Sequence, residues 1–231
     1  MAPPLAHDAY LLVLDSCGER ASVALFLGDT LVAEKVLEER AASTVLLRAV
    51  REILEVGKIG LGQLGGVGVV SGPGSFTGVR VGVAMAKGLC EAARLPVAAV
   101  SRLAVLGQAA GLQDGFALLD AGRGQVYGLR FDKGEPGPEF IAELVEIESQ
   151  LHEAEVAVTT PRLAQQMAGK TGDVRVLELS ARHALGAVQA RFAAGGSDLA
   201  TLDGNYVRAE SAIYGDKSKG KVQEPVRPLL A

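Results

Sequence analysis

The stretch SGPGSFTGVR, residues 71–80, decides the fold because the hydrophobic pattern of the chain changes abruptly across it. An apolar run typical of a strand, residues 67–70, precedes the stretch, and a run with helical periodicity, residues 77–93, follows it. Three glycines and a proline lie in the junction. We therefore predict a tight turn that leads from a strand into a helix.

The residue types in this turn indicate how its backbone is used. Gly72 and Gly74 permit backbone angles that a Cβ disfavours, and Pro73 fixes one φ between them. Thr77 is the expected N-cap of the helix. The backbone amides of such a turn can face an anion or the backbone of a neighbouring segment. The alternative is a glycine-rich connection that serves only packing.

Composition limits the kinds of protein that this chain can encode. With 231 residues and 48% hydrophobic content, the chain can bury a core as one large domain or two small ones. The formal net charge of −4 and the pI near 5.5 argue against nucleic acid gripped over a wide surface. We expect any contact with tRNA to be local or indirect, through another protein.

The apolar stretches are shorter than the roughly 18 residues of a membrane span, and residues 1–9 lack the pattern of a signal peptide. We therefore expect a cytoplasmic protein with no membrane partner. Cys17 and Cys90 form no CxxC pair, so in a reducing compartment we expect buried thiols rather than a disulfide or metal ligands.

Two predicted helices carry wide apolar faces. In residues 43–56 the apolar side chains cover about 200°, whereas a helix covered on one side needs only about 100°. In residues 78–94 the charged side chains form one narrow stripe, and small residues recur every four positions, so a second helix could approach closely. We infer an interface with another chain; the alternative is that the chain's own helices cover these faces. The predicted interface consists of Val45, Leu46, Ala49, Val50, Ile53, Leu54, Gly78, Gly82, Val83 and Ala86.

The order of the predicted elements indicates an internal duplication. An apolar run that ends in Asp15 opens the chain, and a similar run that ends in Asp120 opens its second half. We predict an α/β fold of two βββαβαβα units, the second one eroded. The expected divisions are a first lobe at residues 1–111, a second lobe at 112–210 and a tail at 211–231. In the second lobe we expect strands at 140–147, 156–159 and 174–179 and helices at 161–168 and 181–194.

The turn closely resembles the signature of the TsaB family, also called YeaZ, through Gly72, Pro73, Gly74, Ser75, Phe76, Thr77, Gly78, Val79 and Arg80. The resemblance extends to residues 12–16 with 21–25, to 120–127 and to 205–208, and it covers roughly residues 10–210. Members of this family are non-catalytic partners in the bacterial machinery that adds threonylcarbamoyl to adenosine 37 of tRNA.

The resemblance implies a fold and a set of partners. The fold is that of actin, hexokinase and Hsp70, with two duplicated lobes, of which the second is reduced here. The implied partners are the catalytic subunit TsaD or a second copy of the chain, docked through the first-lobe helices, and the ATPase TsaE.

The polar residues are consistent with a subunit that performs no catalysis. His7, His152 and His183 show no ligand spacing, and residues 41–44 are Ala-Ala-Ser-Thr where the catalytic relative carries metal-binding histidines. We expect no metal, no cofactor and no catalytic residue. Asp15 and Asp120 either cap turns or mark a residual nucleotide site. The alternative function is therefore a small ATP-dependent phosphotransferase or ATPase that acts through these two carboxylates.

Overall fold

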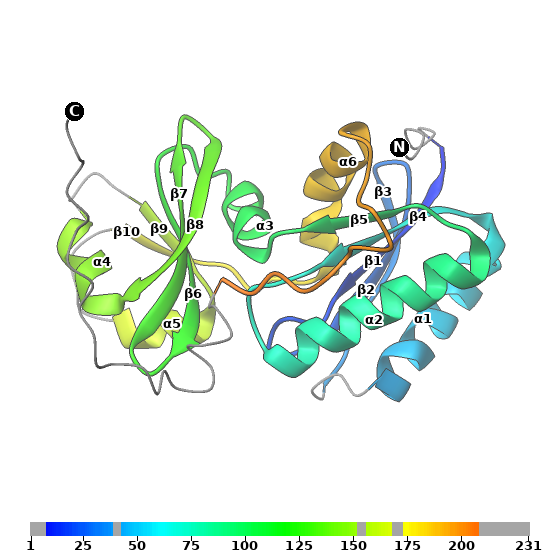
Figure 1. Cartoon of the computed structure of the whole chain (residues 1–231), viewed down its shortest axis with the longest axis horizontal. Coiled ribbons are helices and arrows are strands. Elements are labelled where there is room, and N and C mark those ends of the chain that lie inside the picture. Colours follow the sequence, from blue (N-terminus) through cyan, green and yellow to red (C-terminus); the bar gives the residue numbers. More distant parts are fainter. Residues whose placement is uncertain (1–7, 39–42, 152–155, 168–172, 208–231) are drawn as a thin grey trace, which may run out of the picture.

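Two five-stranded sheets form the framework of the computed structural model, which describes residues 8–38, 43–151, 156–167 and 173–207 (Figure 1). The first sheet has the order β3-β2-β1-β4-β5 and the second the order β10-β9-β6-β7-β8. The strands of the first sheet are β1 (Tyr10–Asp15), β2 (Ser22–Leu27), β3 (Thr30–Val36), β4 (Leu64–Val70) and β5 (Val97–Val100). Those of the second are β6 (Gly115–Gly122), β7 (Gln125–Asp132), β8 (Glu135–Glu143), β9 (Val156–Thr159) and β10 (Asp173–Val176).

The two sheets have the same topology. In each, the first three strands are antiparallel neighbours, and the last two run parallel to the first one. β1 is the central strand of the first sheet, and Leu11 to Asp15 are buried, as an uninterrupted apolar run predicts. The predicted α/β fold of two duplicated lobes is therefore confirmed.

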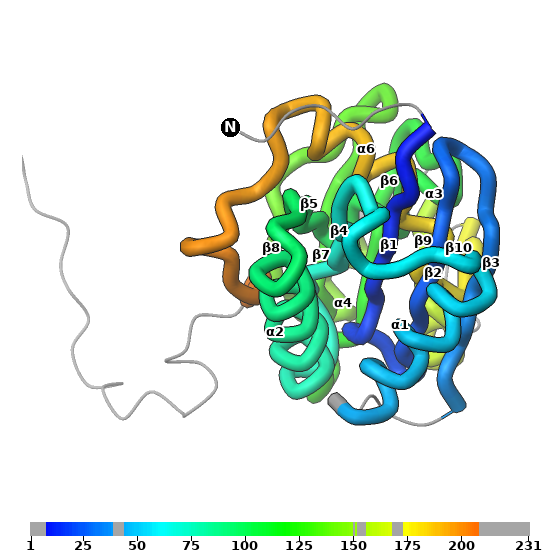
Figure 2. Tube along the Cα trace, turned by 90° about the vertical axis from the view of Figure 1, so that its right-hand side faces the viewer, coloured from blue at the N-terminus to red at the C-terminus, as the bar shows by residue number. Residues whose placement is uncertain are grey.

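Helices cover both faces of the first sheet (Figure 2). α1 (Ser43–Gly57) and α2 (Phe76–Ala93) lie side by side on one face, where they contact β2 and β4. The short 3-10 helices are η1 (Leu61–Gln63) and η2 (Ala181–Ala184), and α6 (Leu185–Ala193) packs on β4 and β5. The second sheet is contacted by α3 (Arg102–Ala109), α4 (Leu144–Gln150) and α5 (Pro161–Met167). α4 and α5 of the second unit have 7 residues each, whereas the equivalent helices α1 and α2 have 15 and 18, as erosion of the second unit predicts.

The halves exchange their final helices. α3 ends the first unit but packs on β6 and β7 of the second sheet, whereas α6 ends the second unit and packs on the first sheet (Figure 1). One continuous core therefore includes Leu106 of α3, Phe131 of β7 and Phe192 of α6. A division of the chain at residue 111 stays a prediction, because the two halves share this core.

Some predicted boundaries are wrong. The strand expected at 140–147 ends at Glu143, because Leu144, Ile147 and Leu151 have helical spacing and turn the chain into α4. The single helix expected at 181–194 is divided into η2 and α6, and the strand expected at 174–179 ends at Val176. The predicted tail at 211–231 lies outside the described residues. Within those residues, no helix is long and apolar enough to cross a membrane.

Candidate functional site

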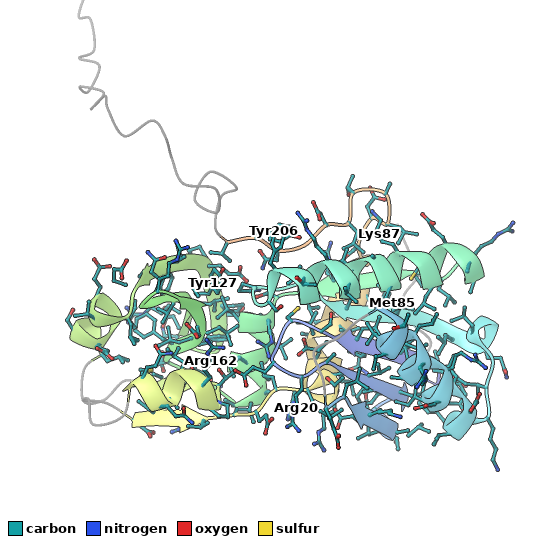
Figure 3. All side chains as sticks on the ribbon, turned by 90° about the horizontal axis from the view of Figure 1, so that it is seen from below. Arg20, Met85, Lys87, Tyr127, Arg162 and Tyr206 are labelled. Carbon is teal, nitrogen blue, oxygen red and sulfur yellow. The ribbon has the colours of Figure 1, made fainter. Side chains whose placement is uncertain are left out.

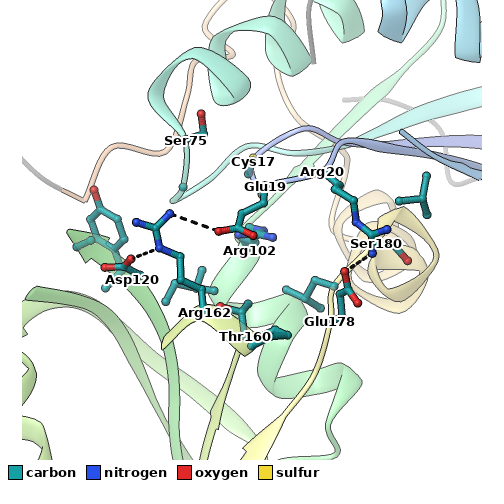
Figure 4. Close-up of a pocket in the computed structure, with 18 of the residues that line it drawn as sticks. Cys17, Glu19, Arg20, Ser75, Arg102, Asp120, Thr160, Arg162, Glu178 and Ser180 are labelled. Carbon is teal, nitrogen blue, oxygen red and sulfur yellow. Dashed lines mark hydrogen bonds and ion pairs between the residues drawn. The ribbon is translucent and has the colours of Figure 1, made fainter. Parts of the chain in front are cut away.

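A cavity of about 680 Å³ lies between the two lobes (Figure 4). Its walls come from segments that are far apart in sequence. The first half of the chain contributes residues 17–20, 74–75, Val36 and Arg102, and the second half contributes residues 119–122, 160–162, 178–180, Tyr127 and Arg182. Asp120 therefore reaches the cavity wall, whereas Asp15 lies just beneath it, next to Cys17.

The two carboxylates cap turns in equivalent positions of the two lobes. The backbone N–H of Cys17 donates to Asp15 Oδ1 over 2.9 Å, and that of Gly122 donates to Asp120 Oδ1 over 2.7 Å. Each side chain thus closes a local turn two residues further along the chain. The turn-capping interpretation is confirmed for both residues.

An arginine neutralises each of these carboxylates. Arg102 Nε lies 3.6 Å from Asp15 Oδ2, and Arg162 Nε lies 2.9 Å from Asp120 Oδ2. Magnesium at a nucleotide site needs carboxylate or water oxygens that face the metal, but here arginine already provides the positive charge. This arrangement argues against Asp15 and Asp120 as magnesium-binding groups.

Further ion pairs cross the cavity between the lobes. Arg162 Nη1 lies 3.3 Å from Glu19 Oε1 of the first lobe, and Arg20 of the first lobe pairs with Glu178 of the second (Figure 4). These side chains are about half exposed or more, so each pair contributes no more than about 1 kcal/mol. Together they add two weak contacts between the two halves of the chain.

A second bridge between the lobes centres on Glu139 of β8. Its carboxylate accepts hydrogen bonds from Ser101 Oγ, just before α3, and from Asn205 Nδ2 over 2.8 Å. Asn205 belongs to residues 195–207, which follow α6 and which we call the strap. The strap pairs with the edge strand β5 at Ser197 and crosses to the second lobe alongside α2 (Figure 1).

The glycines of the signature turn allow close packing against the chain itself. A Cβ on Gly74 would lie 2.3 Å from Cys17 O, and one on Gly78 would lie 1.9 Å from Ser16 O. Gly72 has φ of +115°, and a Cβ there would lie 2.8 Å from Asn205 O. The Ser75 N–H donates to Cys17 O over 2.8 Å. The turn therefore binds the backbone of neighbouring segments, one of the two predicted roles of its amides.

The expected N-cap of α2 is wrong. Ser75, not Thr77, occupies the N-cap, and its Oγ accepts a hydrogen bond from the Gly78 N–H over 3.3 Å. The helix consequently begins at Phe76. Thr77 is an exposed residue of the first turn.

Side chains at the start of α2 contact the strap (Figure 3). The Arg80 guanidinium lies 3.9 Å from the centre of the Phe76 ring, and that ring lies 5.6 Å from the ring of Tyr206. Arg80 Nε donates to Tyr206 Oη over 3.4 Å, and Lys87 Nζ donates to Leu202 O over 3.1 Å. The strap thus occupies the charged flank of α2.

The residues predicted as a partner interface are mostly covered by the chain itself. Val45 is partly buried, and the other nine are buried: Leu46, Ala49, Val50, Ile53, Leu54, Gly78, Gly82, Val83 and Ala86. The side of α2 that carries Gly82 faces Ser16, whose Oγ would lie 2.3 Å from an added Cβ. As a surface for a second helix, these nine residues are a wrong prediction, because the sheet and the loop after β1 already occupy that side.

A different side of α2 remains exposed. Thr77, Ala84, Gly88 and Ala92 are exposed, and Val81 is partly exposed. These five residues are small or medium-sized and uncharged, and they lie next to one another at helical spacing. We call them the outer α2 face. Sequence analysis missed this face because the small residues recur along two sides of the helix.

The next question is whether the described candidate ligands are grouped around a metal site. Within the described ranges, no three His, Cys, Asp or Glu side chains are grouped as a metal would require. His183 Nδ1 accepts from the Ser180 N–H over 3.0 Å, while His7 and His152 lie outside those ranges, as do residues 41 and 42. Cys17 and Cys90 are buried free thiols, as predicted.

Comparisons with known proteins agree with this architecture. The family model described as TsaD, tRNA N6-adenosine threonylcarbamoyltransferase, matches residues 34–146. The tRNA threonylcarbamoyladenosine biosynthesis protein TsaB of Escherichia coli is 35% identical over 131 residues, 55% of this chain and 57% of that protein. Its counterpart in Haemophilus influenzae is 38% identical over 121 residues, 51% of each chain. This chain spans about half the length of the curated relatives it matches.

A solved structure extends the likeness to both lobes. YeaZ from Pseudomonas aeruginosa is 27% identical with a TM-score of 0.72, and the match covers 86% of this chain and 99% of that one. The fold is that of a duplicated two-lobed α/β protein. Ion pairs across the cleft connect its two lobes. The chain belongs to the TsaB (YeaZ) family.

Proposed function

We propose that this chain is a non-catalytic assembly subunit in the synthesis of threonylcarbamoyladenosine on tRNA, and that it docks the catalytic subunit TsaD. The names of its relatives support the pathway. The match of residues 34–146 to the model of the catalytic family supports the partner, since this range contains α1 and α2. Two chains with similar first lobes can pair through equivalent faces around an approximate two-fold axis.

The outer α2 face is the observation that carries this proposal. Its residues are uncharged and exposed, and small side chains such as Ala84 and Gly88 let a second helix approach closely. α1 lies beside it and presents Leu47, whose exposed fraction is 45%. The strap covers the charged flank of α2, on the side of the helix away from α1. A partner helix would therefore approach the outer α2 face on the side next to α1.

The charges in the cleft support a non-catalytic role. Asp15 and Asp120, which would hold magnesium in a nucleotide-dependent enzyme, pair with Arg102 and Arg162. The alternative function, an ATP-dependent enzyme that acts through Asp15 and Asp120, is not supported by these arginine–carboxylate pairs. The proposal also includes TsaE as a further partner and pairing of two copies of the chain through the same face when TsaD is absent.

A matched pair of glycine variants tests the docking face. Gly88 in α2 and Gly186 in α6 are both exposed helical glycines, and an added Cβ would meet no atom within 4 Å at either position. We expect Gly88→Arg to abolish co-purification with TsaD, because a long charged side chain would project from the middle of the outer α2 face. Gly186→Arg should co-purify like the unmodified chain, because α6 lies on the opposite side of the sheet.

The functional readout is the threonylcarbamoyladenosine content of tRNA in cells that depend on this chain. Gly88→Arg should lower that content and Gly186→Arg should not. The mass of the reconstituted complex then gives its stoichiometry and shows whether TsaE joins. Normal co-purification and normal tRNA modification with Gly88→Arg would contradict the proposed face, and magnesium-dependent ATP hydrolysis by the isolated chain would contradict the non-catalytic role.

A further inference from the structure

The strap contains an Asp-Gly pair, Asp203 and Gly204, in a part of its backbone that is neither helix nor strand. The side chain of Asp203 is turned onto its own backbone, because the Gly204 N–H donates to Asp203 Oδ1 over 2.7 Å. Asp203 is exposed, and among the residues that the structure describes no lysine or arginine pairs with its carboxylate. The carboxyl group and the next backbone nitrogen are therefore held in contact, within reach of solvent water.

Contact between these two groups permits a reaction within the chain. When the Gly204 nitrogen attacks Asp203 Cγ, an N–C bond forms, a C–O bond breaks, and the proton of the nitrogen leaves with the carboxyl oxygen as water. The product is a five-membered succinimide ring. Water then opens the ring at either carbonyl and gives aspartate or isoaspartate, in which the main chain runs through Cβ and Cγ. Water is released and taken up again, so the step needs no other reactant, and proximity of the two groups accelerates it.

The glycine leaves the attacking nitrogen accessible. Gly204 has no side chain to shield its nitrogen from the carboxyl group of the preceding residue. Packing of the strap allows no larger residue here, since an added Cβ would lie 2.5 Å from Val79 Cγ1 and 2.7 Å from Tyr206 Cζ. The packing that requires glycine at this position therefore also keeps the Asp-Gly pair reactive.

The sequence contains a second Asp-Gly pair, Asp114 and Gly115, in a different setting. Asp114 Oδ1 accepts a hydrogen bond over 3.1 Å from the backbone N–H of Lys133, which is not the next residue. Gly115 is buried as the first residue of β6, and a Cβ there would lie 2.0 Å from Val156 O. The carboxylate of Asp114 is thus turned towards another segment, and its glycine is fixed in the sheet.

We propose that Asp203 is a site of spontaneous covalent modification, at which the folded chain forms a succinimide with Gly204 and converts aspartate to isoaspartate. Asp114 has the same neighbour in sequence but lacks the contact between the reacting groups, so it stays aspartate in the folded chain. The modification takes water as its only reactant. This site does not depend on the proposed docking of TsaD.

Conversion changes the main chain between two fixed points of the strap. On one side Leu202 O accepts from Lys87 Nζ over 3.1 Å, and on the other the Asn205 N–H donates to Ser71 O over 2.7 Å. Isoaspartate inserts an additional carbon into the main chain between these points, so the two hydrogen bonds cannot both keep their geometry. The contact of Asn205 Nδ2 with Glu139 of the second lobe then loosens as well.

The test is incubation of the full chain in H₂¹⁸O, once folded and once unfolded in urea. Each opening of a succinimide leaves a heavy oxygen at that residue, and mass spectrometry of peptides measures the label and the isoaspartate at Asp203 and Asp114. The rate in the folded chain is divided by the rate in urea for each site, which removes intrinsic differences between the two peptides. We expect this ratio to be at least about tenfold larger at Asp203, because a misplacement of about 1 Å can slow such a reaction about 100-fold.

Asp203→Glu and Asp198→Glu form a matched pair of variants. Both aspartates are exposed residues of the strap, and both substitutions keep the charge. Asp203→Glu moves the carboxyl group one methylene away and requires a six-membered ring, so labelling at residue 203 should fall at least about tenfold. Asp198→Glu leaves the Asp-Gly pair intact, and labelling at Asp203 should remain that of the unmodified chain.

The effect on the strap is read from the isoaspartate form after its chromatographic separation from the unconverted chain. Exchange of the Asn205 backbone N–H should be faster in the isoaspartate form. Equal folded-to-urea ratios at Asp203 and Asp114 would overturn the proposal, because the reaction would then follow unfolding and not the contact in the strap. Undiminished labelling in Asp203→Glu would overturn the succinimide route, and unchanged exchange of Asn205 would overturn the loosening of the strap.

Discussion

The Ser16 hydroxyl donates a hydrogen bond of 2.6 Å to the backbone carbonyl of Gly78, 62 residues further along the chain. This bond joins the end of the central strand β1 to the first turn of α2. The approach is so close that a Cβ on Gly78 would lie 1.9 Å from Ser16 O. Glycine is therefore required here by packing, although its backbone angles are those of an ordinary helix.

Gly78→Ala should consequently destabilise the fold. The added methyl group would force α2 away from β1, and overpacking of this kind costs about 3 kcal/mol. Gly88→Ala is the control, because Gly88 is also helical but has no atom within 4 Å of the added Cβ. That substitution should stabilise the chain by up to about 1 kcal/mol through helix propensity. Urea denaturation of both variants measures the difference, and equal stabilities would refute the packing argument.

Sequence periodicity could predict the fold because each element buries a face with its own regular spacing. The run from Leu11 to Asp15 is apolar at every position but the last, and a central strand covered on both faces needs that pattern. Periodicity shows which side of a helix is apolar, but it does not show what covers that side. α6 was therefore predicted as a helix without any indication that it packs on the first sheet.

The same limit explains why the partner interface predicted from the sequence was placed on the wrong side of the helices. Val50 and Ile53 belong to a wide apolar arc, and burial against the sheet uses most of that arc. The exposed residues of the outer α2 face are small and weakly apolar, so they add little to a helical wheel. Their importance becomes visible only after the sheet and the strap are seen to cover the rest of α2.

The arginines of the cleft had one local signal that sequence analysis did not use. Arg102 is the first residue of α3, and Arg162 is the second residue of α5. A positive charge at a helix amino end is unfavourable, so an arginine there calls for a separate explanation. The explanation involves Asp15 and Asp120, and the contact of Arg102 with Asp15 is far too distant in sequence for any pattern to predict.

The two aspartates should differ in their effect on stability, although they occupy equivalent turns. Asp15→Ala would leave the buried guanidinium of Arg102 without a counter-charge, which costs about 3–5 kcal/mol. Asp120→Ala removes a carboxylate whose partner, Arg162, is 57% exposed and can be solvated, so we expect a loss of about 1 kcal/mol. Chemical denaturation measures both. Similar losses for the two variants would show that burial of the ion pair is not the deciding factor.

Glu139 should contribute to the connection between the lobes. Glu139→Ala removes the acceptor for Ser101 and Asn205, so we expect a loss of about 1–3 kcal/mol. Glu135→Ala is the control, because Glu135 lies in the same strand and is exposed. The backbone N–H of Asn205 donates to Ser71 O over 2.7 Å. Hydrogen exchange of this backbone N–H should become faster in Glu139→Ala and stay unchanged in Glu135→Ala. Unchanged exchange would show that the strap is held by its other contacts.

The buried thiols should make the fold sensitive to alkaline pH. Burial raises the pKa of Cys17 well above its usual value and raises that of Cys90 to about 12. In the unfolded chain a thiol loses its proton near pH 8.5, so above that pH the unfolded state binds fewer protons than the folded state. Stability is therefore complete below that pH and falls as the pH rises towards the folded-state pKa.

Cys90→Ala isolates this effect from the titration of other groups. For the unmodified chain, linkage gives a loss of about 2 kcal/mol per buried thiol between pH 8 and pH 10. The variant lacks one of the two thiols, so its free energy of unfolding should fall by about 2 kcal/mol less over the same interval, whatever the substitution does to stability at pH 8. Parallel pH profiles of the two proteins in urea denaturation would mean that the Cys90 thiol ionises as readily in the folded chain as in the unfolded one.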